Sequence, residues 1–187
     1  MLTVETERLR LIPLDLTNLL LLKQERALME KNMGLEISHM VIDPQIQAEM
    51  DEAIDFWITR VNENEEEYPW FTNWEMVLKD KNLSIGGIGL TGLPDRRGEV
   101  TVGYGVDATY HCQGYATEAL QAMIPWIFKN AHAHRVVAET LKDNYASHKV
   151  LLKNGFVQAA EKDLLFIWKL ERSLYFLNYL KEMSHNL

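Results

Sequence analysis

The feature that most constrains the fold of this chain is a glycine-bearing turn between a strand-like segment and a helical one. It lies in residues 111–120, which read His-Cys-Gln-Gly-Tyr-Ala-Thr-Glu-Ala-Leu. The start of a helix exposes N–H groups that lack intrahelical partners, and the helix dipole adds partial positive charge there. Gly114 lets the backbone approach a ligand closely, and the small Ala116 leaves the helix start open. The run therefore predicts a phosphate cradle, with a plain turn before a helix as the alternative.

A second motif, Asn144–Phe156, follows at a compatible distance and reads Asn-Tyr-Ala-Ser-His-Lys-Val-Leu-Leu-Lys-Asn-Gly-Phe. With both motifs the chain resembles the GNAT superfamily of acyl-CoA-dependent N-acetyltransferases. Within it, the chain is most similar to the branch that acetylates N-terminal amines of ribosomal proteins. The resemblance covers nearly the whole chain, because residues 6–11, 84–90 and 102–106 are similar to strands of that branch.

The resemblance implies an α/β (α+β) fold, a single GNAT-like domain over residues 1–187 with a mixed, mostly antiparallel central sheet flanked by helices. It also implies an acetyl-CoA-dependent N-acetyltransferase that moves an acetyl group directly to a primary amine, on a protein N-terminus or a small molecule. A non-catalytic acyl-CoA-binding sensor of the same fold is the alternative, because His111, Thr101 and Leu151 depart from the family pattern.

Composition narrows the class of protein and its partners. A chain of 187 residues with 47% hydrophobic residues is long enough for one domain with a sizeable core. The net charge of −8 argues against nucleic acid as a partner, because phosphate contacts need clustered Lys and Arg. No apolar run is long enough for a bilayer and the start lacks the form of a secretory signal, so we expect no membrane association and a cytoplasmic location.

The resemblance places the cofactor along one strand and the loop that follows it. The pantetheine arm would lie along Tyr104–Val106, with the Val106 amide N–H facing the thioester oxygen. The family's loop pattern is Gln or Arg, two variable residues, Gly, one variable residue, then Gly or Ala. The matching positions here are His111, Cys112, Gln113, Gly114, Tyr115 and Ala116. Thr117 would add a hydroxyl to the exposed amides, and Asn144 would be a further cofactor contact.

Two residues of this loop, His111 and Cys112, carry side chains with chemistry of their own. His111 stands at the Gln or Arg position, where its charge depends on pH. Cys112 is the single cysteine, which excludes an internal disulfide, and a helix start lowers the pKa of a thiol. No His-Asp constellation surrounds Cys112 in the sequence, so direct transfer is favoured over a covalent intermediate.

The proton donor and the base are less firmly specified than the cofactor site. Many relatives carry a donor tyrosine where this chain has Leu151, and in the most similar branch a serine at the position of Ser147 has that role. The structural alternative is that Asn144 caps a helix with Ser147 in its first turn. Strand alternation places Glu99 and Thr101 on one face, so Glu99 is either a base acting through water or an exposed strand-end carboxylate.

Two histidines and a group of aromatic residues have structural explanations as well as functional ones. His132 and His134 alternate in a loop without further ligands at recognisable spacing, so we expect no metal. A group of aromatic residues belongs either to the hydrophobic core or to the wall of an acceptor pocket. Its members are Trp57, Trp70, Phe71 and Trp74.

Hydrophobic periodicity predicts the secondary structure. Strands are expected from Leu9 to Pro13 and over 135–140 and 164–170, with an antiparallel meander formed by 74–79, 83–90 and 99–106. Helices are expected over 15–29, 46–62, 115–129 and 146–153, and Pro125 predicts a kink or an early stop in the third of these. An amphipathic C-terminal helix over 172–185 would pack on the domain or make the contact of a possible homodimer.

Overall fold

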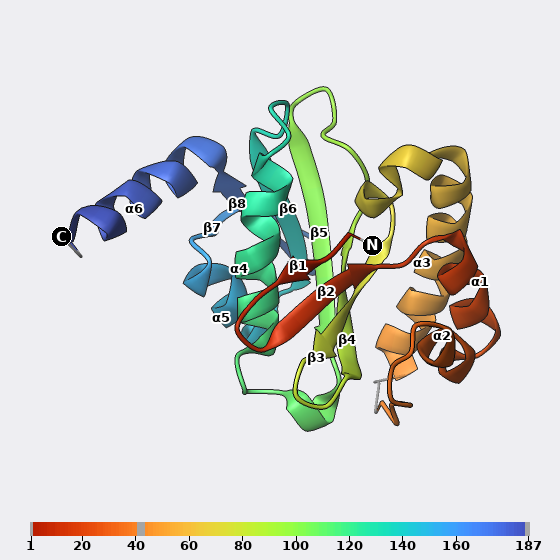
Figure 1. Cartoon of the computed structure of the whole chain (residues 1–187). Helices are drawn as coiled ribbons and strands as arrows, with labels where there is room; N and C mark the ends of the chain where they lie inside the picture. Colours follow the sequence, from red (N-terminus) through yellow and green to blue (C-terminus); the bar gives the residue numbers. More distant parts are fainter. Residues whose placement is uncertain (1, 41–43, 186–187) are drawn as a thin grey trace.

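The computed structural model describes residues 2–40 and 44–185. One sheet with the strand order β1-β2-β3-β4-β5-β6-β8-β7 runs through the centre of the molecule (Figure 1). Its strands are β1 (Val4–Glu5), β2 (Leu9–Pro13), β3 (Asn73–Leu78), β4 (Leu83–Leu90), β5 (Glu99–Val106), β6 (Arg135–Leu141), β7 (Val157–Lys162) and β8 (Leu165–Glu171).

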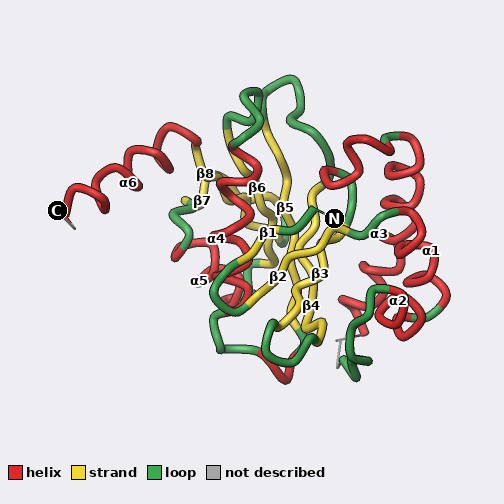
Figure 2. The backbone as a smooth tube through the Cα atoms, in the orientation of Figure 1, coloured by secondary structure: helices red, strands yellow, loops and turns green. Residues whose placement is uncertain are grey.

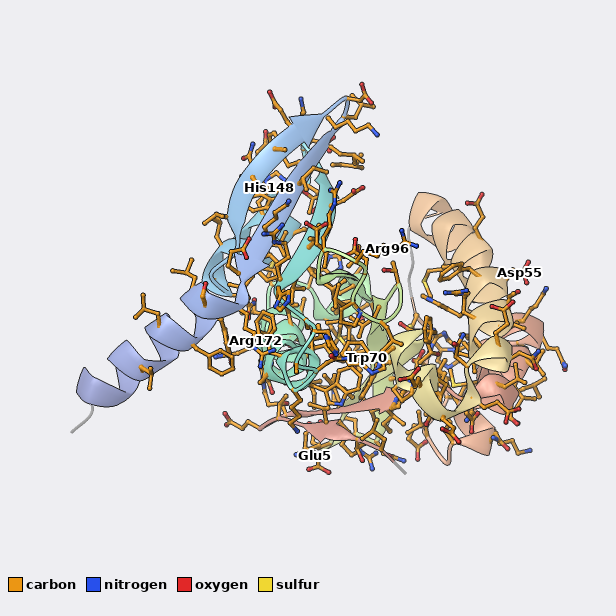
Figure 3. All side chains as sticks on the ribbon, turned by 90° about the horizontal axis from the view of Figure 1, so that it is seen from above. Glu5, Asp55, Trp70, Arg96, His148 and Arg172 are labelled. Atoms are coloured by element: carbon orange, nitrogen blue, oxygen red, sulfur yellow. The ribbon has the colours of Figure 1, made fainter. Side chains whose placement is uncertain are left out.

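Helices cover both faces of this sheet (Figure 2). One side carries α1 (Leu16–Gln24), α2 (Arg26–Asn32) and α3 (Pro44–Glu63), followed by a 3-10 turn, η1 (Glu65–Trp70). The other side carries α4 (Tyr115–Phe128) and α5 (Tyr145–Lys153), and a second 3-10 turn, η2 (Ala108–Tyr110), lies between β5 and α4. The last helix, α6 (Arg172–His185), extends away from the body of the molecule (Figures 1 and 3).

Strand pairing confirms the predicted mixed, mostly antiparallel sheet. Neighbouring strands from β1 to β5 pair antiparallel, as do β6, β8 and β7. The exception is the parallel pair β5 and β6, whose ladder covers three residue pairs, from Glu99 opposite Arg135 to Thr101 opposite Val137. Beyond Thr101, β5 stays paired with β4 while β6 stays paired with β8. The two strands therefore separate, and among the described residues the edge of β5 that faces β6 has no strand partner from Val102 onward.

Alternation along the strands divides the core into two layers. Side chains on one face, among them Trp74, Met76 and Ile88, pack against Leu120 and Ile124 of α4. A second cluster under α1 and α3 contains Leu14, Leu19, Ile54, Val61 and Phe71. Because side chains of a strand alternate between the faces, residues such as Asn73 and Glu75 necessarily point toward α1–α3.

Two predicted elements differ from the structure. The single helix expected over 15–29 is interrupted at Glu25, whose φ of −165° and ψ of 130° are extended. The interruption turns the chain so that the Arg26 guanidinium lies 2.9 Å from the buried Glu75 carboxylate, a contact between distant segments that periodicity cannot reveal. Strand β7 was not predicted because all of its residues are exposed, so no apolar alternation marks it.

The remaining helix predictions come close to the structure. Helix α4 runs through Pro125 and ends at Phe128. The first turns of α6 pack on the body, with the rings of Tyr175 and Phe176 centred 5.6 and 6.3 Å from that of Phe128. In the described part of the chain, no helix combines the length and apolar character needed to cross a membrane.

Candidate active site

The loop between η2 and α4 has the geometry of an anion-binding helix start. Gly114 is the N-cap of α4 with φ of 85°, a left-handed conformation that glycine adopts without strain. Cys112, exposed and with φ of 60°, begins this turn. Among the described residues, no acceptor lies within hydrogen-bond distance of the N–H groups of residues 114–117. Four backbone donors at the positive end of the α4 dipole therefore point out of the fold.

Arg8 and Glu118 hold this loop against the first strands. The Arg8 guanidinium lies 2.6 Å from the Glu118 carboxylate and donates a 3.0 Å hydrogen bond to the carbonyl oxygen of Gln113. It also stacks over the ring of Tyr115, with 4.3 Å between the guanidinium carbon and the ring centroid. The Thr6 hydroxyl and the Arg8 N–H donate to the same carboxylate. Sequence reasoning missed this anchor, because no local pattern relates residues more than a hundred positions apart.

We expect Glu118→Gln to lower the free energy of unfolding by about 1–2 kcal/mol at pH 7, because charge-assisted hydrogen bonds are lost. Burial raises the pKa of Glu118, but hydrogen bonds from Thr6 and Arg8 outweigh burial and hold it below its ordinary value. A lowered folded-state pKa stabilises the fold above the unfolded pKa of about 4.3, and this contribution is lost as the pH falls through the folded pKa. Urea unfolding at pH 7 and at pH 3.5 should therefore show a smaller difference between variant and wild type in acid.

The control for this measurement is Glu7→Gln, at an exposed neighbouring carboxylate that forms no ion pair within the part of the chain that the structure describes. Glu7→Gln should change stability by less than about 0.5 kcal/mol at both pH values. An equal loss for the two variants, or a Glu118→Gln effect independent of pH, would contradict the anchoring role.

The other predicted loop residues lie at the same end of the sheet. The ring nitrogen Nε2 of His111 lies 2.7 Å from the Val106 carbonyl oxygen, so Nε2 carries the proton and braces the end of β5. The side chain of Gln113 donates to the Thr109 carbonyl oxygen at 3.3 Å. Thr117 lies in the first turn of α4, and its carbonyl oxygen accepts a 3.3 Å hydrogen bond from Asn154. The structure thus brings the predicted loop together, while His111 points toward β5.

Tyr104 connects β5 to α5 across the gap where β5 and β6 separate. Its hydroxyl donates to the backbone carbonyl oxygen of Ser147 at 3.3 Å. Burial raises the pKa of Tyr104 to about 12, so this phenol stays protonated at neutral pH. The Asn144 side chain accepts a 3.1 Å hydrogen bond from the Ser147 N–H and caps α5. The capping geometry expected as the structural alternative is therefore present, with Ser147 in the first turn of α5 and its backbone carbonyl oxygen bonded to Tyr104.

A cavity of about 850 Å³ opens on the opposite side of β5. Its floor is the backbone of β4 and β5, and its walls come from α3, the start of α2 and the loop that carries His111. Of the aromatic group, Trp57 lines this cavity together with Phe56. The rings of Trp70 and Trp74 instead contact the ring of Trp126 beside the core, tilted and edge-on respectively, with centroids 4.5 and 4.9 Å from it. The remaining lining includes Arg26, Asn73, Gly87, Gly103, Gly105, Val106 and Asp107.

Glu99 lies at the far end of β5 from this cavity. Its carboxylate is 2.8 Å from Arg135 and 3.4 Å from Lys169. The hydrogen bond from Arg135 holds the pKa of Glu99 below its ordinary value. At about 3.3 Å per strand residue, Glu99 is about 23 Å along β5 from Val106. The structure does not bring this predicted base to the residues predicted to hold the thioester.

An unpaired strand edge, a free helix start beside it and a cavity on the other side of the same strand thus lie together at one end of β5. The sequence pattern described as the acetyltransferase (GNAT) domain matches residues 8–157, most of the chain. The chain belongs to the GNAT acetyltransferase family. It is therefore an N-acetyltransferase, in a family whose members use acetyl-CoA.

Individual relatives agree with this membership. An uncharacterized N-acetyltransferase of Bacillus subtilis, YjdG, is 29% identical over 157 residues, which cover 84% of this chain and 90% of the relative. The ribosomal-protein-serine acetyltransferase of Escherichia coli is 32% identical over 82 residues, 44% of this chain and 45% of that protein. Among solved structures, the ribosomal L7/L12 alpha-N-protein acetyltransferase RimL in complex with coenzyme A superposes with a TM-score of 0.64 at 17% identity, covering 91% of this chain and 98% of that one. At that identity, the last comparison supports the GNAT fold alone.

Proposed function

We propose that this GNAT protein transfers the acetyl group of acetyl-CoA directly to a primary amine, with peptide N-termini as the first acceptors to test. The observation that carries the proposal is the free helix start at Gly114 beside the unpaired edge of β5. The first can hold a pyrophosphate through residues 113–117, and the second can pair with a pantetheine arm along Tyr104–Val106. Asn144 and His111 stay predicted cofactor contacts.

Acetyl-CoA supplies a thioester, and the residues of this chain orient it and manage the protons. The amine nitrogen forms a bond to the acetyl carbon, and the bond from that carbon to sulfur breaks. The Val106 N–H is proposed to stabilise the negative charge that develops on the acetyl oxygen. The Ser147 hydroxyl donates a proton to the departing thiolate and recovers one from water, while the amine loses its proton to solvent. The products are an N-acetylated amine and the free thiol of coenzyme A.

The acceptor amine determines how much base catalysis is needed. An α-amino group with a pKa near 8 costs about 1.4 kcal/mol to deprotonate at pH 7, whereas a lysine near 10.4 costs about 4.6 kcal/mol. Glu99, the base predicted from the sequence, does not line the cavity. An α-amino group, which needs less base catalysis, is therefore the better match. The E. coli relative is named for a ribosomal-protein serine, which adds support for a peptide N-terminus beginning with serine.

The experiment combines thermal unfolding with acetyl-CoA and thiol release with amines. Acetyl-CoA at a hundred times its dissociation constant should add about 2.7 kcal/mol, or about 5–11 °C for a chain of this size. Thiol release is then measured with a hexapeptide that begins with serine, with its N-acetylated form as the blocked control, and with spermidine. A shift with amine-dependent release supports the proposal. A shift without release on any free amine would favour an acyl-CoA-binding sensor, and no shift would contradict the cofactor site.

Glu99→Gln tests the predicted base. Because Arg135 and Lys169 engage this carboxylate far from Val106, we expect turnover within twofold of wild type and an unchanged pH profile. The free energy of unfolding should fall by about 0.5–1 kcal/mol, typical of partly exposed ion pairs. Glu171→Gln, which removes another partner of Arg135, is the matched control for stability. A severalfold loss of turnover with intact acetyl-CoA binding would instead restore Glu99 as the base.

A further inference from the structure

The side-chain amide of Asn73, on β3, faces the cavity and has no role in the mechanism proposed above. The side chain of Asn73 is buried, with the residue only 4% exposed, and it lies over Gly87 of β4. A Cβ atom placed on Gly87 would be 2.3 Å from the Asn73 side-chain oxygen Oδ1. Among the described residues, no donor lies within hydrogen-bond distance of this oxygen. A buried carbonyl oxygen that faces a cavity without a partner is a candidate to receive a hydrogen bond from a ligand.

A buried carboxylate determines which end of the Asn73 amide faces the cavity. The Asn73 nitrogen Nδ2 donates to Oε1 of Glu75 at 2.9 Å. Glu75 is fully buried, and its other oxygen accepts from the Ser84 hydroxyl and from Arg26 at 2.9 Å. The reverse orientation would place the amide oxygen against a carboxylate, which only accepts hydrogen bonds. Glu75 therefore locks the oxygen of Asn73 toward the cavity.

The floor beside Asn73 has no side chains. Gly87 of β4 pairs with Gly105 of β5, and Gly89 pairs with Gly103. A Cβ atom at Gly103 or Gly105 would meet no atom within 4 Å, so the space above these two residues is open. Neighbouring strands lie about 4.8 Å apart, so the Asn73 side chain over Gly87 of β4 is about one strand spacing from the backbone of Gly105 and Val106 on β5. That interval accommodates one amine nitrogen between the Asn73 oxygen and a thioester on Val106.

The charges around this space favour an amine. Arg26 is the cation in the cavity wall, and it is already paired with Glu75 and with Glu30 at 3.6 Å. Both carboxylates are fully buried behind the wall, and Glu52 adds an exposed carboxylate to the lining. The surplus of negative charge attracts a protonated amine to the cavity. Once the amine is neutral, a carbonyl oxygen is a suitable partner for one of its N–H groups.

From these observations we infer that Asn73 positions the acceptor amine, with Glu75 as the group that fixes the Asn73 amide. The inference rests on the proposed function and assigns the acceptor side of the same site. The Asn73 oxygen accepts one N–H of the neutral amine, which turns the nitrogen lone pair toward the acetyl carbon near Val106. Orientation of this kind accelerates transfer without proton exchange at Asn73, because the amide does not titrate in the working range.

The test is Asn73→Ala with Ser84→Ala as the matched control. Each variant removes one hydrogen bond to Glu75, but Ser84 is not among the residues that line the cavity. The probes are the hexapeptide that begins with serine and spermidine, and the better of the two is used. We expect Asn73→Ala to lower kcat by 10- to 100-fold and leave the thermal shift by acetyl-CoA and the pH profile unchanged. Ser84→Ala should keep kcat within twofold of wild type.

The outcomes separate this inference from the proposed function. A wild-type protein without amine-dependent thiol release overturns both. An active wild type in which Asn73→Ala and Ser84→Ala have the same kcat overturns the role of Asn73 alone, as does a pH profile that moves with Asn73→Ala. Should Asn73→Ala fail to fold, Asn73→Ser replaces it, because its hydroxyl retains a donor for Glu75, and the same kcat comparison applies.

Discussion

Gly86→Ala should lower the free energy of unfolding by at least about 3 kcal/mol and turnover by at least about 100-fold. Gly86 has a backbone φ of 152°, an angle that residues other than glycine rarely adopt. An added Cβ would lie 2.2 Å from the Gly105 carbonyl oxygen and 2.8 Å from Cα of Val106. Both are backbone atoms, so relief requires β4 and β5 to move apart at the position where the thioester is proposed to bind. Urea unfolding and thiol release measure the two effects.

The stability control is Gly103→Ala on the neighbouring strand. A Cβ there meets no atom within 4 Å, and the φ of Gly103 is not positive. Gly103→Ala should therefore match or exceed the wild-type stability, because alanine restricts the unfolded chain more than glycine does. Equal stabilities of Gly86→Ala and wild type would mean that β4 and β5 are farther apart at Val106 than the structure has them.

Local sequence patterns were sufficient to predict the central antiparallel meander and the open helix start after Gly114. Alternation along 74–79, 83–90 and 99–106 marked the meander, since each strand buries one face against α4. The turn at Gly114 could be predicted because the need for a left-handed residue and an open helix start is a local requirement. The resemblance to GNAT proteins rested on this loop and on the motif at 144–156, and family membership is now confirmed.

The parts of the site that depend on long-range contacts could not be predicted. Arg8 reaches Glu118 and Arg26 reaches Glu75 only after the sheet has formed, and nothing near these residues in the sequence marks the pairing. The predicted strand began at residue 74, so Asn73 lay just before it in the sequence. Its burial results from pairing with β4 and from the helices on that face of the sheet, which no local pattern reveals. The prediction of Glu99 as a base did not anticipate its distance along β5 from Val106, because strand alternation specifies the face of a residue and not its position along the strand.

These contacts suggest a division of labour along β5. In the proposed site, its unpaired edge and the α4 start beyond it would hold the cofactor, and its glycine-bearing face would hold the acceptor, so one strand would align the two substrates. Close approach of β4 at Gly86 fixes that strand from the other edge. The anchoring pair Arg8 and Glu118 fixes the loop in turn, so that donor groups are in place before the cofactor arrives. Preorganisation of this kind reduces the entropic cost of binding.

Ala116→Glu should weaken acetyl-CoA binding by at least about 100-fold, or about 2.7 kcal/mol. The residue lies in the first turn of α4, among the free N–H groups predicted to hold the pyrophosphate. A carboxylate there occupies the anion site and repels the phosphates, and two like charges 4 Å apart cost about 4 kcal/mol near a protein surface. At an acetyl-CoA concentration that stabilises wild type by about 2.7 kcal/mol, the variant should gain only about 0.4 kcal/mol.

The stability of the ligand-free variant separates lost binding from lost folding. An acidic residue at a helix start stabilises the helix by about 0.3–1 kcal/mol, so Ala116→Glu should unfold at the same temperature as wild type or slightly above it. Gln121→Glu adds the same charge at an exposed position farther along α4 and should keep the full shift with acetyl-CoA. If acetyl-CoA shifts the unfolding of Ala116→Glu as much as that of wild type, the start of α4 does not bind the phosphates. If Ala116→Glu and Gln121→Glu lose the acetyl-CoA shift equally, the loss is a general effect of net charge.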